Sequence, residues 1–169
     1  NTSIILGRDQ KSRPYTGRAV TLTDFVVKAG TTILAKGQDY TVSYTDNVAV
    51  GTATMTITGK NRYVGSKSVT FKITGEKFTT GNIIVKEYDK EHPSDNDFKA
   101  SMPYTGSAVL QNKVTLATKA TKEKPNSKQL VYGTHYTISY KNNVKKGTAT
   151  MIFTAKPESG YSGSFKKTF

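Results

Sequence analysis

The residues of this chain that could carry out acid–base or nucleophilic chemistry are few and lie in unrelated settings. The 169 residues include two histidines, twelve acidic residues and no cysteine. A catalytic site needs an acid, a base or a nucleophile held within hydrogen-bond reach of its partners. His92 stands beside Pro93, and His135 stands where a repeated segment of the chain has Asp39. Neither setting contains a serine and a carboxylate in a triad pattern. We therefore expect no catalytic residues and no cofactor.

One stretch is rich in the oxygen ligands that calcium prefers. It is the segment YDKEHPSDNDFK, whose candidate ligands are Asp89, Glu91, Asp95, Asn96 and Asp97. Their order lacks the glycine and the final glutamate of an EF-hand loop. We expect an exposed acidic loop over residues 88–99 and no metal site, with cation binding by residues 89–97 as the alternative.

Tyrosines and lysines make a better case for ligand binding. Carbohydrate sites use aromatic rings as platforms with polar groups at their edges, and the chain has ten tyrosines and no tryptophan. Eight of the tyrosines recur in both halves of the chain, which favours a role in the fold. Tyr88 and Tyr132 have no counterpart. Together with Lys122 and Lys124 of a basic loop, they are the candidate ligand-binding residues.

A duplicated unit must position these residues. Residues 38–57 return as residues 134–153, with eleven of the twenty positions identical. Two shorter motifs, PYTG and a Tyr-x-Gly-Ser turn, recur in the same order on either side. A fixed internal period of this kind indicates a tandem array of one domain. The sequence predicts two domains, residues 1–76 and 77–169, and the second carries loop insertions.

Alternation of large apolar with small polar residues predicts β-strands in both copies. No segment shows the period of a helix, and glycine, asparagine and proline separate the alternating stretches. The predicted strands include residues 3–6, 20–27, 33–34, 39–44, 52–57, 69–73, 83–85 and 130–131. Several short strands at close spacing are typical of a sandwich. The predicted fold class is all-β, with two tandem immunoglobulin-like antiparallel β-sandwich domains.

The net charge of +13 is spread evenly. Residues 1–74 carry ten basic against four acidic residues, and residues 75–169 carry fifteen against eight. No run of five basic residues occurs, so the charge indicates a well-solvated surface and no specific nucleic-acid binding. Loose attraction to anionic cell-wall polymers or acidic glycans is the alternative. No apolar stretch is long enough to insert into a membrane. Both ends of the chain are typical of a segment cut from a longer protein.

The repeated motifs resemble those of a known group of modules. PYTG, then DYTVSY at 39–44, GTAT at 51–54 and the glycine turn at 59–65 are similar to the immunoglobulin-like repeats, of the YDG and MBG type, in large surface and secreted proteins of Firmicutes. The second copy departs from the pattern at His135 and in the expanded turn at 155–160. The resemblance implies an extracellular module without shared catalytic residues. We expect this segment to be a monomer.

The function expected from this resemblance is that of a non-catalytic structural or adhesion module, a spacer or stalk of a bacterial surface or secreted protein. The alternative is a carbohydrate-binding accessory module of a secreted or cell-surface glycan-degrading protein. A cell-wall polymer, a glycan or a host surface protein would be the partner in either case.

Overall fold

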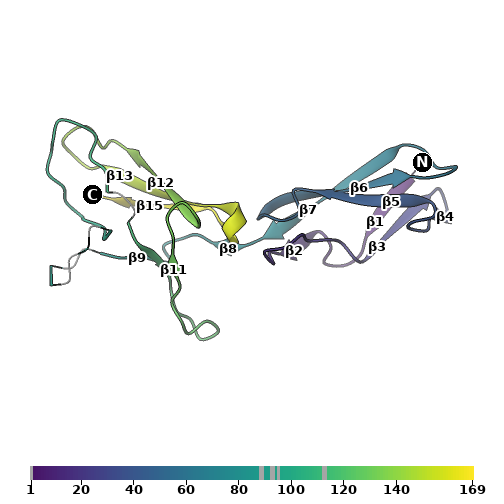
Figure 1. The fold of residues 1–169 in the computed structure, drawn as a ribbon, viewed down its shortest axis with the longest axis horizontal. Helices are drawn as coiled ribbons and strands as arrows, with labels where there is room; N and C mark the ends of the chain where they lie inside the picture. Colours follow the sequence, from purple (N-terminus) through teal and green to yellow (C-terminus); the bar gives the residue numbers. More distant parts are fainter. Residues whose placement is uncertain (1, 88–89, 92–93, 95, 112–113) are drawn as a thin grey trace. The chain divides into compact units, whose positions relative to one another are not determined.

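The structure is a computed structural model of the chain, and it describes residues 2–87, 90–91, 94, 96–111 and 114–169. Within these residues the chain forms β-strands, one short 3-10 helix at Pro157–Ser159 and no α-helix (Figure 1). Nearly all strand pairs are antiparallel. The predicted all-β class is confirmed.

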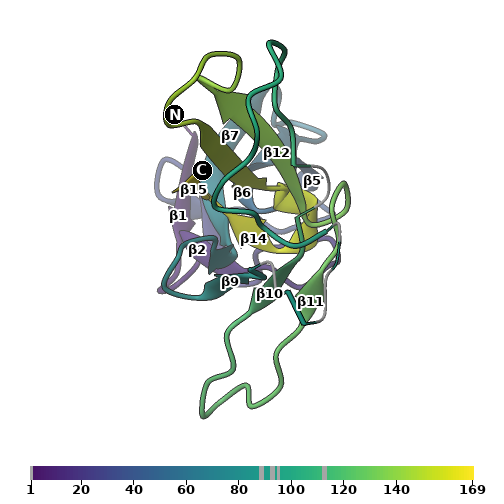
Figure 2. The same ribbon diagram turned by 90° about the vertical axis from the view of Figure 1, so that its left-hand side faces the viewer.

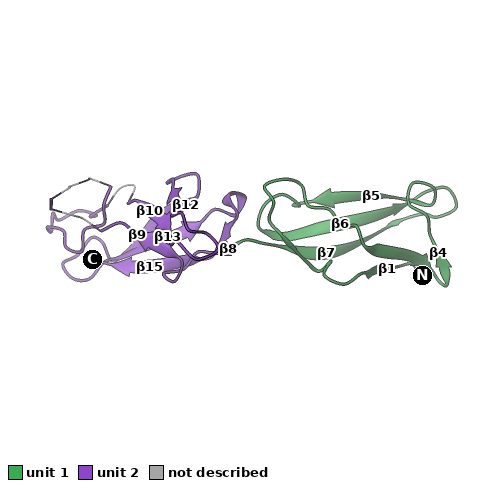
Figure 3. Ribbon diagram, turned by 90° about the horizontal axis from the view of Figure 1, so that it is seen from below, with its two compact units in different colours: residues 1–75 green, residues 76–169 purple. Residues whose placement is uncertain are grey.

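The chain divides into two compact units, residues 1–75 and 76–169 (Figure 3). In the first unit, one sheet has the order β1-β3-β4 and the other has the order β2-β7-β6-β5. Their bounds are β1 Thr2–Leu6, β2 Ser12–Pro14, β3 Phe25–Ala29, β4 Thr32–Ile33, β5 Tyr40–Thr45, β6 Gly51–Gly59 and β7 Ser66–Thr74.

The first unit buries the inward residues of both sheets in one core. Along β5, Tyr40, Val42 and Tyr44 alternate with exposed residues, as the period of two requires. Met55 on β6 is fully buried beside them. Val27 of the other sheet belongs to the same cluster, so apolar side chains of the two sheets meet there.

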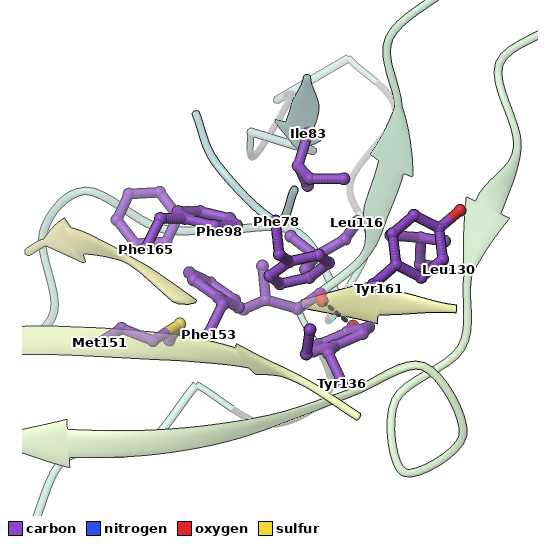
Figure 4. Packing of buried hydrophobic residues seen from close by; sticks show 12 residues of the cluster. Phe78, Ile83, Phe98, Leu116, Leu130, Tyr136, Met151, Phe153, Tyr161 and Phe165 are labelled. Carbon is purple, nitrogen blue, oxygen red and sulfur yellow. Dashed lines mark hydrogen bonds between the residues drawn. The ribbon is translucent and has the colours of Figure 1, made fainter. Parts of the chain in front are cut away.

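The second unit has three small sheets, in the orders β12-β13-β15, β11-β10-β9 and β14-β8. Their bounds are β8 Glu76–Lys77, β9 Ile83–Val85, β10 Leu116–Thr118, β11 Gln129–Leu130, β12 Tyr136–Lys141, β13 Thr150–Ala155, β14 Tyr161–Ser162 and β15 Ser164–Thr168. Its core is rich in aromatic rings. The ring of Phe78 lies 6.2 Å from that of Tyr136 and 5.3 Å from that of Phe165 (Figure 4).

The repeated segments pair in the same register. In the first unit Tyr44 lies opposite Met55, and in the second Tyr140 lies opposite Met151. The burial pattern of β12 also matches that of β5, residue for residue. A shift of one residue would turn every buried side chain outward, so the shared sequence pattern holds the same register in both copies.

One predicted strand is shorter than expected. The strand predicted over residues 20–27 begins only at Phe25, although Val20 and Leu22 are buried as the pattern required. The Val20 N–H donates to the carbonyl of Asn47, and the Leu22 N–H donates to the hydroxyl of Tyr44. These backbone groups are satisfied by a loop and a side chain, so this stretch is buried without joining a sheet.

The turn after β6 explains one difference between the copies. An alanine Cβ at Gly59 would lie 2.5 Å from the carbonyl oxygen of Tyr63, closer than carbon and oxygen can approach. The second copy has the buried Ala155 at this position, and its turn is two residues longer. Both turns close with the same 3.0 Å backbone bond, from residue 59 to Gly65 and from residue 155 to Gly163. The longer turn makes room for the methyl group.

Gly59→Ala is therefore expected to destabilise the first unit by about 1–3 kcal/mol, the usual cost of overpacking. Ala155→Gly, the reverse change at the matching position, should cost the second unit no more than about 1 kcal/mol. Thermal unfolding of the two variants measures both effects. Equal losses from the two substitutions would contradict this account of the longer turn.

Candidate ligand-binding surface

Tyr44 and Tyr140, which match in the repeat, each bind a loop to the strand that carries the tyrosine. The loop precedes β3 in the first unit and β10 in the second. The Leu22 N–H donates to the Tyr44 hydroxyl at 3.1 Å, and that hydroxyl donates to the Leu22 carbonyl at 3.2 Å. In the second unit the Gln111 N–H donates to the Tyr140 hydroxyl at 2.9 Å, and that hydroxyl donates to the Gln111 carbonyl at 2.6 Å. We call this reciprocal pair of bonds the tyrosine clamp.

An asparagine three residues after each clamp tyrosine makes a second link. The Asn47 side-chain amide donates to the carbonyl of Val20 at 2.9 Å, and that of Asn143 donates to the carbonyl of Val109 at 3.0 Å. In the opposite direction, the Val20 N–H donates to the backbone carbonyl of Asn47, and the Val109 N–H donates to that of Asn143, both at 2.7 Å. The most distinctive polar residues of the repeat thus satisfy buried backbone groups of their own unit.

Tyr44→Phe and Tyr140→Phe are each expected to lower the free energy of unfolding of their own unit by about 1–2 kcal/mol, because each leaves one backbone N–H and one carbonyl without a partner. Tyr132→Phe is the matched control, since Tyr132 is exposed. Urea unfolding of the three variants gives the comparison. If the control lost as much stability as the clamp variants, the clamp would carry no special role.

Burial keeps other tyrosines neutral. Desolvation raises the pKa of Tyr136 to about 12, and the nearby Tyr132 adds to the rise. Burial also raises the pKa of Tyr40 and Tyr161. The Tyr136 hydroxyl donates to the carbonyl of Val114 inside the core. These rings are structural, as the recurrence of the tyrosines predicted.

His135 has a structural role as well. Its Nδ1 accepts a 2.9 Å bond from the Val131 N–H, and in the first unit an Asp39 carboxylate oxygen accepts a 2.8 Å bond from the Ala35 N–H. The two side chains close the same turn before β5 and β12. This explains why histidine can replace aspartate here: a neutral imidazole also offers an acceptor.

The acidic stretch is not wholly the exposed loop that the sequence predicted. Asp97 is 2% exposed and Phe98 is 1% exposed. The Asp97 carboxylate lies 3.3 Å from the Lys86 ammonium group, so its charge faces a cation of the chain itself. Phe98 belongs to the core cluster, and its anchoring draws the neighbouring carboxylate inward. The predicted exposure was wrong at these two residues. Apolar and polar residues do not alternate around Phe98, so the sequence pattern did not mark its ring as facing the core.

Only part of the candidate cation-binding stretch at residues 89–97 lies within the described residues. Tyr88, Asp89, His92 and Asp95 lie outside the described residues. In the described ranges no three histidine or acidic side chains come together in a way that could hold a metal ion.

One hollow of the second unit lies along the basic loop that only this copy has, residues 119–128, between β10 and β11. It has a volume of about 800 Å³. Figure 2 shows this loop projecting from the ends of β10 and β11. The lining is polar and mixed in charge, with Glu76, Lys77, Asn82, Thr118, Lys119, Thr121, Glu123, Lys124, Pro125, Asn126, Lys128 and Tyr161. We call this surface the basic-loop groove.

Polar bonds hold the groove in shape. The Lys124 ammonium group forms an ion pair with Glu76 on β8. The Lys119 ammonium group donates to the carbonyl of Thr80 at 3.2 Å, and the Ser127 hydroxyl donates to the carbonyl of Thr118 at 2.7 Å. The loop is therefore tied back at both of its ends, and its amide, hydroxyl and ammonium groups converge on one hollow.

The four predicted ligand-binding residues separate in the structure. Lys124 lines the basic-loop groove, whereas Lys122 is exposed on the same loop and is not part of the lining. Tyr132 is 43% exposed, with its ring 5.8 Å from that of Tyr136, and it also lies outside the lining. Tyr88 falls outside the described residues.

Sequence reasoning missed most of the groove. Lys77, Asn82 and Thr118 come from three separate segments that meet only after folding. The sequence signal that pointed toward them was the insertion at residues 119–128, which the first copy lacks.

Tyr104 is a further correction. Its recurrence as Tyr15 favoured a role in the fold, and Tyr15 does pack against the core of the first unit. Tyr104 is instead 56% exposed. It lines a second hollow, of about 210 Å³, with Pro103, Lys146 and Phe169 among its neighbours.

Comparison of the chain with protein-family models, curated proteins and solved structures found no match. The similarity to immunoglobulin-like repeats thus rests on the sequence motifs. Across the described ranges no helix has both the length and the apolar character to cross a membrane.

Proposed function

We propose that this chain is a non-catalytic structural and adhesion module of a bacterial surface or secreted protein, built from two tandem immunoglobulin-like β-sandwiches. The observation that carries the proposal is the duplicated tyrosine clamp with its asparagine link. It commits the most distinctive polar groups of the repeat to holding each unit together. The motif resemblance supports an extracellular setting for such a module.

A module of this kind gains from units that resist unfolding without disulfides. The chain has no cysteine. Each clamp closes a span of 22 or 29 residues by side-chain bonds to backbone. These partly buried bonds take the place of a covalent staple between a strand and the loop opposite it, and they leave the turns free to vary between copies.

The test is to express residues 1–75, residues 76–169 and the whole chain. We expect each to unfold cooperatively and each to be monomeric by light scattering. None should hydrolyse a panel of polysaccharides and peptidoglycan fragments. Turnover of any of these substrates that His135→Ala abolishes would contradict the proposal.

A second candidate function is binding of a glycan or an anionic wall polymer, and the basic-loop groove favours it. The groove belongs to an insertion of one copy only, and loops can acquire binding groups without disturbing the strands beneath them. Its lysines, amides and hydroxyls suit a ligand with hydroxyl and carboxylate or phosphate groups. The buried Tyr161 offers no exposed ring, so polar contacts would dominate recognition.

Lys128→Gln and Lys122→Gln form a matched pair for this function, because both remove one charge and only Lys128 lines the groove. If the groove binds, a glycan and wall-polymer array should show that Lys128→Gln weakens retention several-fold while Lys122→Gln leaves it unchanged. Equal losses would indicate diffuse charge attraction. Failure of the whole chain to bind any polymer would leave the structural function alone.

A further inference from the structure

The inference concerns the outward face of the four-stranded sheet in the first unit. The buried residues of β5, β6 and β7 are apolar, and the residues that alternate with them point away from the core. On β6 these outward residues are Thr54, Thr56 and Thr58. Their partners on the neighbouring strand β5 are, in the same order, Thr45, Ser43 and Thr41.

The strand β7 completes the array on the other side of β6. Its residues opposite the three β6 threonines are, in the same order, Thr70, Ser68 and Ser66. Every position of this part of the sheet therefore carries a hydroxyl group, in three rows of three. Figure 3 shows the three strands side by side in the first unit. We call these residues the hydroxyl face.

The sheet holds the hydroxyl groups at regular intervals. Neighbouring strands lie about 4.8 Å apart, and alternate residues along one strand lie about 6.7 Å apart. In the middle row the hydroxyl oxygens of Thr56 and Ser68 are hydrogen bonded at 2.9 Å. Met55 and Ile57, which flank Thr56 in the chain, are buried in the core and fix the strand beneath the face.

The hydroxyl face carries no charge, although residues 1–74 contain ten basic and four acidic residues. An outward face that only has to be solvated can carry charge, and the equivalent face of the second unit does so. There the counterparts of Thr45, Thr56 and Ser68 are Lys141, Ile152 and Lys166, in the same cross-strand register. The fold therefore does not require an uncharged hydroxyl array, and only the first unit has a complete one.

We propose that the hydroxyl face binds an extended neutral polysaccharide. A hydroxyl group both donates and accepts hydrogen bonds, so it can pair with a sugar hydroxyl in either direction. The methyl groups of the threonines add apolar contacts for the C–H groups of the sugar rings. A polymer repeats the same groups along its length, so several weak contacts form together and reinforce one another.

The absence of charge selects the class of polysaccharide. An anionic polymer would lose water on this face without meeting a cation, which is unfavourable. This inference goes beyond the proposed function, because it gives the first unit a neutral ligand. The basic-loop groove, in contrast, lies in the second unit and suits carboxylate or phosphate groups.

Retention of the whole chain by microcrystalline cellulose and by insoluble chitin tests the proposal. We expect at least one solid to retain the chain, with little change when NaCl is raised from about 0.1 M to about 0.5 M, because salt screens only interactions between charges. Release of most of the protein by salt would assign retention to the basic surface. That result, or no retention by either solid, would overturn the proposal.

Thr45→Lys and Ser68→Lys each introduce the residue that the second unit already has at the matching position, so the fold accommodates both. Each should lower the bound fraction by about fivefold or more, because the new ammonium group would lose water without a partner. Thr32→Lys is the matched control, since Thr32 is exposed on β4 of the other sheet. It should leave retention unchanged, and equal losses in the three variants would defeat the proposal.

Titration of the ¹⁵N-labelled whole chain with cellohexaose and with the hexamer of N-acetylglucosamine locates the site without any substitution. We expect amide shifts in residues 41–45, 54–58 and 66–70. Shifts confined to residues 119–128, or none with either sugar, would overturn the proposal. Lys128→Gln should not affect retention by cellulose or chitin, so failure of the hydroxyl face and failure of the basic-loop groove are distinguishable.

Discussion

Met151→Ala is expected to lower the free energy of unfolding of the second unit by about 2–5 kcal/mol. Met151 is fully buried and faces Tyr140 across the β12–β13 ladder. Removing its side chain costs the transfer free energy of the lost atoms and leaves a cavity among rigid aromatic rings, which cannot collapse easily to fill it. Since small domains have a total stability of about 5–15 kcal/mol, the loss would be a large part of the whole.

Met55→Ala is the matched variant in the first unit, where Met55 is equally buried and faces Tyr44. We expect a loss of the same size, confined to that unit. Differential scanning calorimetry of the whole chain, with the isolated units as references, assigns each transition. A shift of both transitions by either variant, or a loss below about 1 kcal/mol, would show that the inward faces of the strands are assigned wrongly.

Alkaline pH is expected to destabilise the second unit by about 2–3 kcal/mol between pH 10 and 12, at about 1.4 kcal/mol per unit of pKa difference. The pKa of Tyr136 is raised from 10.0 to about 12 in the folded state. Below the unfolded-state pKa both states hold the proton, and stability is unaffected. Between the two pKa values the unfolded state releases its proton while the folded state keeps it, so stability falls as the pH rises.

Urea unfolding at a series of pH values, followed together with phenolate absorbance, measures this dependence. Tyr136→Phe removes one ionising group and should reduce the slope for the second unit above pH 10, while Tyr140 and Tyr161, whose pKa values burial also raises, keep part of it. The variant also loses the bond to the Val114 carbonyl, so its stability at neutral pH should be lower by about 1 kcal/mol. A slope that is unchanged in Tyr136→Phe would assign the alkaline loss to other groups.

The candidate binding residues show the limit of arguments from recurrence. Tyr132 and Lys122 were selected because the first copy lacks them, yet neither lines the basic-loop groove. Lys124, selected for the same reason, does line it. A segment that is present in one copy and absent from the other is correctly identified as an insertion. It does not tell which side chains of that insertion point toward other segments, because that depends on where β8 and β10 lie.

The sequence by itself determined the all-β class, the positions of the central strands and the alternation of inward and outward residues along β5 and β12. These features depend on a period of two and on spacings within a few residues, which are local. The tertiary structure alone decided that Asp97 and Phe98 are buried, that Tyr104 is exposed although Tyr15 is not, and that Lys77, Asn82 and Thr118 share one groove. Each of these features depends on which distant segment of the chain packs against the residue. That contact cannot be inferred from the alternation of apolar and polar residues or from the repeat.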